Sequence, residues 1–423
     1  MSGPKDGTGA VTIRQAPWPY RAMLAICSDL DETPDARVYL EIARFLNTNE
    51  PTAMGEGVGL EVGNTMYFDM PPGQFSYWGT DDAGREMARA LMRSGHIDAI
   101  HSWGDLATER RHAEQNLAEL EKHGCRLEVW IDHSKAPSNF GPDIMVGQGD
   151  LPGAAAYHAD LTLAYGVRYV WRGRTTGLTG QDAPVRPRSF APMLRKGKAI
   201  VSTRTVLKEA AKVALGLLGS PRWRLYGANR VCRPCALRDG NRAWEFLRTN
   251  PSWGGPGESA TAAGIEDVLT TGMLDVLVAS GGAAILYTHL GKVVDPVSPF
   301  GAGTVGAFRH LARLRDVGTI LVTTTQRLLR YVTVRDHIHC RAAVMGEKTV
   351  VTVDDIEDPV AGRRPPSAAD LHGLTFGVER DGPVEVRLAN GDALPCDPVA
   401  TEDGTTWLRI PWPALRFPDL GGS

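Results

Sequence analysis

The stretch GHIDAIHSWGD, residues 95–105, decides how the rest of the chain is interpreted. It begins as the end of a helix, continues as a short apolar strand and finishes with His101 and Asp105, an imidazole and a carboxylate four positions apart. Such a pair just past a strand can supply two ligands to a divalent ion. The stretch therefore predicts one half of a metal site.

A second half is expected upstream, in CSDLDET at residues 27–33, where another apolar run ends in two acids. A metal used for hydrolysis needs about three protein ligands and an open position for water. Asp31 is the third candidate ligand, which leaves Asp29 as a base that takes a proton from water. In the alternative interpretation, Asp105 caps the following helix and His101 is a packed strand-end residue.

The overall composition is that of an ordinary soluble globular protein. The 423 residues are 43% hydrophobic and 22% charged, with a formal net charge of -3, so neither nucleic acid nor an anionic membrane is an expected partner. No apolar run is long enough for a membrane span, and residues 1–20 lack a signal-like apolar centre, which predicts a cytoplasmic location. Six cysteines are too few for a disulfide scaffold, and one CxxC pair, Cys232 and Cys235, gives only weak support for zinc.

Strand-like and helix-like patterns alternate from residue 21 to residue 333, which predicts parallel strands with helical crossovers. Acids, imidazoles and arginines recur at the C-terminal ends of these strands. We therefore expect a (β/α) barrel of seven or eight strands rather than an open sheet. The expected strands cover residues 21–28, 57–62, 97–100, 126–131, 167–170, 243–247, 283–287 and 318–322. The expected helices cover residues 35–47, 81–94, 108–123, 152–165, 205–218, 261–279, 305–315 and 324–331.

Three further segments flank or interrupt this pattern. Residues 1–20 are expected to be a flexible N-terminal segment. Residues 173–240 carry many Gly, Pro and Arg residues around one helix and are interpreted as an insertion in the catalytic domain that covers the substrate. Residues 334–423 contain short strand patterns separated by Asp-Gly, Asn-Gly and Pro turns, which predicts a β-rich C-terminal module, either packed on the barrel or binding glycan.

The motifs follow the order of those in a known enzyme family. Gly95-His96 is followed by His101-Ser102-Trp103, two acids precede them at Asp29 and Asp31, and a late strand ends at His289. In this the chain resembles the polysaccharide deacetylase (NodB-homology) family. In that family the two acids are adjacent, whereas Leu30 separates them here, and Asp105 stands where the second motif has His.

The resemblance implies an activity and a set of roles. Family members have a (β/α) barrel and remove acyl groups from N-acyl sugars with zinc or a similar divalent ion. By analogy, Asp29 is the base and His289 the general acid, while Asp31, His101 and Asp105 hold the metal, expected to be Zn²⁺. The implied function is hydrolysis of a C–N bond in an N-acylated sugar or a related small amide.

Other strand-end residues are candidates for substrate binding. His133 is also a possible replacement ligand for the family's third motif, which is not clearly visible. The substrate-binding candidates are Asp132, His133, Trp171, Arg172, Arg248 and Asn250. By contrast, His337 and His339 near Cys340 are expected to be surface residues between the domains.

Two other functions fit parts of the sequence. Asp29-Leu30-Asp31-Glu32-Thr33 also resembles the DxDx[TV] motif of haloacid-dehalogenase-type phosphatases, in which the first Asp attacks phosphorus and a late acidic pair binds magnesium. The only late Asp-Asp pair is Asp354-Asp355, in the β-rich segment. A non-catalytic barrel that binds glycans is the third possibility. The oligomeric state is not predicted by the sequence.

Overall fold

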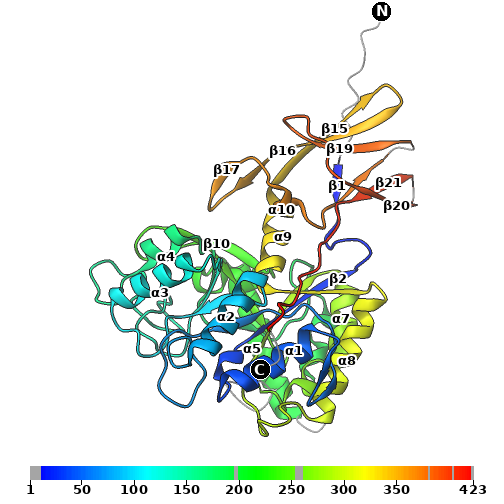
Figure 1. Ribbon diagram of the computed structural model, residues 1–423. Coiled ribbons are helices and arrows are strands. Elements are labelled where there is room, and N and C mark those ends of the chain that lie inside the picture. Colours follow the sequence, from blue (N-terminus) through cyan, green and yellow to red (C-terminus); the bar gives the residue numbers. More distant parts are fainter. Residues whose placement is uncertain (1–10, 195–198, 253–260, 380–381, 403, 421–423) are drawn as a thin grey trace, which may run out of the picture.

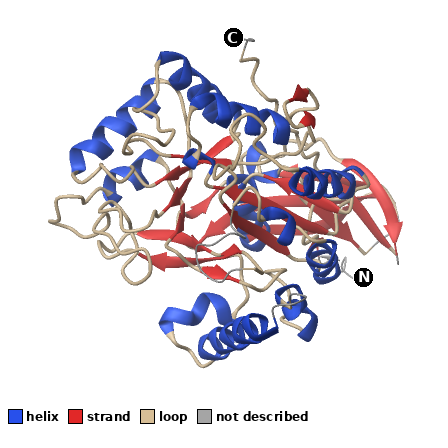
Figure 2. Cartoon of the chain, turned by 90° about the horizontal axis from the view of Figure 1, so that it is seen from below, coloured by secondary structure: helices blue, strands red, loops and turns tan. Residues whose placement is uncertain are grey.

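The computed structural model describes residues 11–194, 199–252, 261–379, 382–402 and 404–420. A large curled sheet with helices around it forms the main body, and a smaller β-rich module lies at one end of it (Figure 1). Seen from below, the strands run through the middle and most helices lie outside them (Figure 2). This arrangement confirms a mixed α/β architecture.

The curled sheet is mainly parallel, and β10 pairs antiparallel with β11 at one edge. Strand β14 (Ile320–Thr323) pairs with β2 outside the main order. The main order is β10 (Cys232–Ala236), β11 (Arg242–Phe246), β8 (Tyr169–Trp171), β7 (Val129–Ile131), β6 (Ile97–His101), β5 (Asn64–Met66), β2 (Ala22–Ser28), β13 (Ala283–Thr288), β12 (Arg248–Thr249) and β9 (Thr175–Thr176).

The segment 242–249 contributes a strand near each end of this order, β11 near one end and β12 near the other. Here β11 pairs with β8, and β12, which begins just after Leu247, pairs with β13. On the other side of β2, β14 pairs with Ala22 to Ala25, whereas β5 pairs only at Ser28. The result is a curled, barrel-like parallel sheet, and the complete barrel of seven or eight strands stays a prediction.

Alternate residues of β2 enter two different apolar clusters, as expected for a strand with both faces buried. Leu24 and Ile26 lie in the cluster formed with the outer helices. The outer helices are α1 (Ala36–Asn47), α2 (Asp82–Ser94), α3 (Arg110–Lys122), α4 (Ala159–Tyr165), α7 (Thr271–Ser280) and α8 (Ala302–Asp316). Among the described residues, no helix is both long and apolar enough to cross a membrane.

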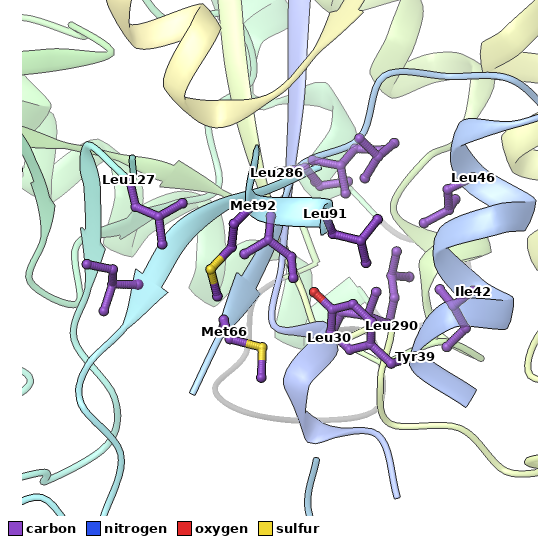
Figure 3. Packing of buried hydrophobic residues seen from close by; sticks show 14 of the residues in the cluster. Leu30, Tyr39, Ile42, Leu46, Met66, Leu91, Met92, Leu127, Leu286 and Leu290 are labelled. Carbon is purple, nitrogen blue, oxygen red and sulfur yellow. The ribbon is translucent and has the colours of Figure 1, made fainter. Parts of the chain in front are cut away.

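Helix α1 illustrates which features of the sequence determine where an outer helix begins and which face it buries. The Asp35 carboxylate accepts a hydrogen bond from the Val38 N–H at 2.8 Å, so the helix has a side-chain N-cap. Its apolar residues recur at helical spacing, and Tyr39, Ile42 and Leu46 point toward the core (Figure 3).

The strand expected at residues 57–62 is not formed, and the next strand, β5, begins at Asn64. The backbone N–H groups of Val58, Gly59 and Leu60 instead donate to the carbonyls of Phe45, Thr48 and Leu46 at the end of α1. These donors cap a helix and are therefore unavailable to a sheet. A short hairpin of β3 (Pro51–Thr52) and β4 (Gly55–Glu56) precedes them.

Two expected helices are shorter than their patterns. Only Ala159–Tyr165 of residues 152–165 is α-helical, and residues 261–279 contain a 3-10 turn at Ile265–Asp267 before α7. The insertion contains α5 (Ala199–Leu217) and α6 (Arg224–Gly227). The Lys212 ammonium on α5 donates to the Thr175 carbonyl of β9 at 2.9 Å. The role of the insertion as a cover over the substrate stays a prediction.

Helix α9 (Thr325–His337) connects the main body to the β-rich module (Figure 1). It places Leu328, Leu329 and Val332 in the same buried cluster as Ala25 of β2 and Ile131 of β7. Residues of the β-rich module join this second cluster, so the module and the curled sheet share a core.

The β-rich module consists of two four-stranded sheets. One sheet contains β15 (Ile338–Met345), β16 (Lys348–Asp358), β17 (Gly362–Arg364) and β19 (Val384–Leu388), and the short helix α10 (Ala368–Leu371) follows β17. The other has the order β1 (Val11–Ile13), β18 (Thr375–Val378), β21 (Thr405–Arg409) and β20 (Asp397–Glu402).

Segments near both ends of the described chain contact the domain on the other side of the expected boundary. Within the stretch expected to be flexible, residues 1–10 lie outside the described residues, whereas β1 is hydrogen-bonded to β18 of the C-terminal module. After β21 the chain returns to the main body, where the Leu415 N–H donates to Glu61 and Phe417 contacts the His96 ring.

Candidate active site

Asp29 lies directly after β2, where three elements of the curled sheet meet. Its backbone N–H donates to the Thr288 carbonyl of β13 at 3.0 Å, which brings the following residue, His289, to its side. The chain then turns through a 3-10 helix, Leu30–Glu32, and Leu30 enters the outer apolar cluster. The single residue between the two acids therefore belongs to the core.

The Asp29 carboxylate is buried against a buried cation. The Arg248 guanidinium of β12 donates to Asp29 Oδ1 at 2.9 Å and to the Cys27 carbonyl at 2.7 Å. His289 Nε2 lies 3.3 Å from the other carboxylate oxygen. Burial alone would raise the pKa of Asp29, but the charges of Arg248, His101 and His289 lower it to about 2. Asp29 therefore stays anionic.

Arg248 is fixed by aromatic rings as well as by Asp29. Its guanidinium lies 4.5 Å from the centroid of the Trp171 ring and 4.1 Å from that of Tyr287. Two of its nitrogens, Nε and Nη1, are buried without a hydrogen-bond partner. The residue predicted to bind substrate is thus placed to orient Asp29.

A second group forms around Asp31 beside the first. Asp31 Oδ2 lies 3.1 Å from His101 Nδ1, and its Oδ1 accepts a hydrogen bond from Thr65 at 3.0 Å. Burial, followed by the charge of Asp29, raises the pKa of Asp31 well above its usual value. Burial lowers the pKa of the His101 imidazole to about 4. His101 Nδ1 is also 3.9 Å from Asp29 Oδ1, so the two groups are continuous.

Asp105 and His133 form a third group, at the exposed edge of the cluster. Asp105 Oδ1 lies 2.9 Å from His133 Nδ1, and this interaction lowers the pKa of the Asp105 carboxyl. The rings of His133 and His101 are 5.0 Å apart at their centroids. Since Asp105 is exposed and His133 half-buried, the cluster is in contact with solvent on this side.

Tyr67 connects these groups and was not singled out by the sequence. Its ring stacks on His101 at 4.3 Å and meets the edge of His133 at 4.9 Å. Its hydroxyl is buried with no hydrogen-bond partner. Thr65 and Tyr67 were missed because the preceding strand was expected at 57–62, and a strand ending at Met66 would have pointed to both.

The remaining predicted substrate-binding residues are engaged in structural contacts. Asp132 accepts hydrogen bonds from the Trp130 indole at 2.7 Å and the Phe140 N–H at 2.9 Å. Arg172 donates to Glu245 at 3.0 Å. Asn250 donates to the Tyr287 carbonyl at 3.1 Å. The structure therefore brings Asp29, Asp31, His101, Arg248 and His289 together, with His133 and Asp105 beside them.

Three side chains on the His289 side, Glu32, Lys292 and Tyr287, complete the surroundings and were also missed. The Glu32 carboxylate lies 3.6 Å from His289 Nε2 and 3.1 Å from Lys292 Nζ. Burial, followed by the charge of Asp29, raises the pKa of Glu32 to about 7. The Tyr287 hydroxyl is 3.2 Å from His289 Nε2.

The donor chemistry of the cluster suits a divalent ion, but the set is incomplete. Ligands about 2.0–2.1 Å from one ion lie roughly 3 Å apart, which is the separation of Asp31 Oδ2 and His101 Nδ1 at 3.1 Å. Asp105, the third predicted ligand, instead pairs with His133. Within the described ranges, no three His, Cys, Asp or Glu side chains are arranged to hold a metal. The zinc site stays a prediction.

The other sequence candidates lie apart from this cluster. Cys232 and Cys235 are in β10, opposite Phe246 and Ala243 of β11. In the β-rich module, Asp355 pairs with His339 at 3.0 Å, and Asp354 with Arg341 at 3.2 Å. His337 Nδ1 contacts the Thr333 carbonyl.

Comparisons with known proteins leave the family open. No model of a known protein family and no curated protein matches this chain. Among solved structures, the endo-beta1,6-glucanase BT3312 is similar at a TM-score of 0.33 and 9% sequence identity, over 97% of this chain and 95% of that chain. A similarity of this size carries no argument about function.

Proposed function

We propose that this protein is a metal-dependent hydrolase that, like the polysaccharide deacetylases it resembles, cleaves the C–N bond of an N-acylated sugar or a related small amide. One observation supports this most. His101 and His289, identified from motifs far apart in the sequence, each place a ring nitrogen within 4 Å of an Asp29 carboxylate oxygen, at 3.9 Å and 3.3 Å. They converge at the C-terminal ends of parallel strands, which is where (β/α)-barrel enzymes assemble their active sites.

In this proposal Asp29 is the base. Arg248 keeps the carboxylate anionic and fixes its direction, so Asp29 can take a proton from the water that attacks the amide carbon. His289 Nε2 lies 3.3 Å from Asp29, within reach of that proton, and acts as the acid that protonates the leaving amine. Tyr67 stacks on His101 and holds a buried hydroxyl without a hydrogen-bond partner beside these residues.

Asp31 and His101 would hold the metal, and Asp105 or His133 would supply the third ligand. A divalent ion bound there supplies Lewis-acid polarisation of the amide carbonyl. The His133 ring contacts the His101 ring, with centroids 5.0 Å apart, and Asp105 contacts His133, so this pair lies next to the two other ligands.

The direct test is the metal content of the purified protein. We expect about one divalent ion per chain, most simply zinc, and its loss in Asp31→Asn and His101→Ala variants. Asp132→Asn is the matched control, since this buried carboxylate binds the Trp130 indole and the Phe140 N–H. Equal metal content in all variants, or none in the wild type, would exclude the proposed centre.

Activity separates this proposal from the alternatives. Release of acetate from an N-acetylated oligosaccharide, abolished by Asp29→Asn, is the expected result. Magnesium-dependent phosphate release from a phosphomonoester would instead identify a phosphatase, although the Asp354 and Asp355 pair that this alternative requires is bound to Arg341 and His339. Glycan binding unaffected by loss of Asp29 would identify a non-catalytic protein.

A further inference from the structure

Helix α5 presents an apolar face to solvent. Four leucines on its outer side and just beyond its end are exposed: Leu207 (65%), Leu215 (42%), Leu217 (72%) and Leu218 (83%). Ala211 and Ala214 lie between them on the same side of the helix and are exposed too. A contiguous exposed apolar face of this kind marks an interaction surface.

The opposite side of α5 fixes its orientation. Glu209 accepts a hydrogen bond from Thr176 at 3.0 Å, and the Lys212 ammonium contacts both Glu209 and the Thr175 carbonyl. Gly216 packs against Gly227 of α6 so closely that a Cβ at Gly216 would lie 2.5 Å from the Gly227 nitrogen. The leucine side therefore cannot turn inward without breaking these buried contacts.

The segment that contains α5 is strongly basic. The insertion, residues 173–240, includes fourteen Lys or Arg residues and three acids, Asp182, Glu209 and Asp239, in a chain whose formal net charge is -3. Arg204 and Lys208 are exposed on the flank of the leucine face. The net charge of the whole chain does not reveal this local excess of Lys and Arg residues. For that reason an anionic membrane was not an expected partner.

We propose that the outer face of α5 docks the protein on an anionic lipid bilayer, with the leucines in the headgroup boundary and Arg204 and Lys208 against the lipid phosphates. Amphipathic helices with leucines on one face and basic residues beside it bind bilayers in this way without spanning them. A second copy of the chain is a disfavoured partner, because the basic segment of one copy would lie against the basic segment of the other. A nucleic acid would leave the leucines uncovered.

This surface lies close to the candidate active site. On the inner side of α5, Thr175 and Thr176 of β9 pair with Arg248 and Thr249 of β12. Arg248 in turn holds Asp29. Docking through α5 would therefore bring the site near the bilayer surface.

The test is sedimentation of the full-length protein with vesicles. We expect binding to phosphatidylcholine vesicles that contain about one third phosphatidylglycerol, little binding to phosphatidylcholine alone, and weakening by salt. The double variant Leu207→Glu/Leu218→Glu should bind at least about tenfold less, and Arg204→Glu/Lys208→Glu should lose the preference for anionic vesicles.

Val294→Glu and Val317→Glu are matched controls, because these valines are 88% and 72% exposed elsewhere in the main body. They should bind as the wild type does, and circular dichroism should show all variants folded. Absence of wild-type binding to the anionic vesicles, or equal binding by the leucine variant, would overturn the proposal. So would light scattering that shows a dimer in the wild type and a monomer in the leucine variant.

Discussion

Two buried carboxylates on the curled sheet, Asp29 after β2 and Asp98 within β6, have opposite electrostatic surroundings. Asp29 faces the Arg248 guanidinium, and its pKa is about 2 despite burial. Asp98 accepts a hydrogen bond from the Gln326 N–H at the start of α9, and burial raises its pKa to about 7. One carboxyl is kept charged, while the other is satisfied mainly by neutral donors.

The difference separates a candidate catalytic group from a structural one. Burial desolvates both residues, so burial alone does not identify the reactive carboxylate. What distinguishes Asp29 is a cation from β12, together with His289 from β13. Asp98 instead helps to anchor the N-terminus of α9 to the sheet, where a helix favours a negative or hydrogen-bond-accepting group.

The strongest test of this difference is Arg248→Met. Removing the cation leaves Asp29 buried without its partner, so we expect the free energy of unfolding to fall by about 3–5 kcal/mol and hydrolytic activity to be lost. Urea unfolding followed by circular dichroism measures the change in stability. The double variant Arg248→Met/Asp29→Asn should regain much of the stability but no activity. A double variant as unstable as the single one would show that Arg248 acts through packing on Trp171 and Tyr287 alone.

The effect expected from Asp98→Asn depends on pH. The folded-state pKa of Asp98, about 7, lies above its ordinary value of 3.8, so the folded protein holds a proton that the unfolded chain releases. Its contribution to stability is present below pH 3.8 and is lost as the pH rises to 7, on the order of 4 kcal/mol in total.

Asp98→Asn should therefore flatten the decline in stability between pH 4 and pH 7, measured by urea unfolding at several pH values. Asp29 has the opposite sign, since its depressed pKa contributes stability above pH 3.8 that is lost as the pH falls toward 2. An unchanged slope in the Asp98 variant would contradict the assignment.

The smallest effect is expected for Tyr67→Phe. The Tyr67 hydroxyl is buried without a hydrogen-bond partner, so its removal should leave stability unchanged or raise it by less than about 1 kcal/mol. If the hydroxyl contacts substrate, KM should rise several-fold. Tyr39→Phe is the control, because the Tyr39 hydroxyl donates to the Thr65 carbonyl and its loss should destabilise the protein. Equal losses of stability in both variants would contradict this view of Tyr67.

Much of the fold was predictable from local patterns. The strand ending at Ser28 and the helix beginning after Asp81 follow from an apolar run and a side-chain N-cap. The failure at residues 57–62 has a tertiary cause, because the backbone of this apolar segment caps α1. The pairing of β1 with β18 could not be predicted either, since Val11–Ile13 is too short to identify its partner.

The candidate site was predictable to the same extent. Asp29, Asp31, His101 and His289 follow strands and converge as the sequence suggested. The partner of Asp29 was not predictable, because Arg248 reaches it from a strand more than 200 positions away. Asp105 was assigned to the metal from its spacing to His101, but a nearer partner, His133, lies beside it. Sequence spacing shows which side chains share an edge, not which pairs form within it.

The placement of β1 has a consequence for how the chain is completed during synthesis. The Trp18 N–H, just after β1, bonds to Thr375, 357 positions away. Strand β1 therefore has no sheet partner until β18 has been synthesised, and contacts this distant in the sequence form slowly. Until then the edge of β1 that will pair with β18 has no backbone partner there. The sheet that contains β18, β21 and β20 is complete only once β1 has joined its edge.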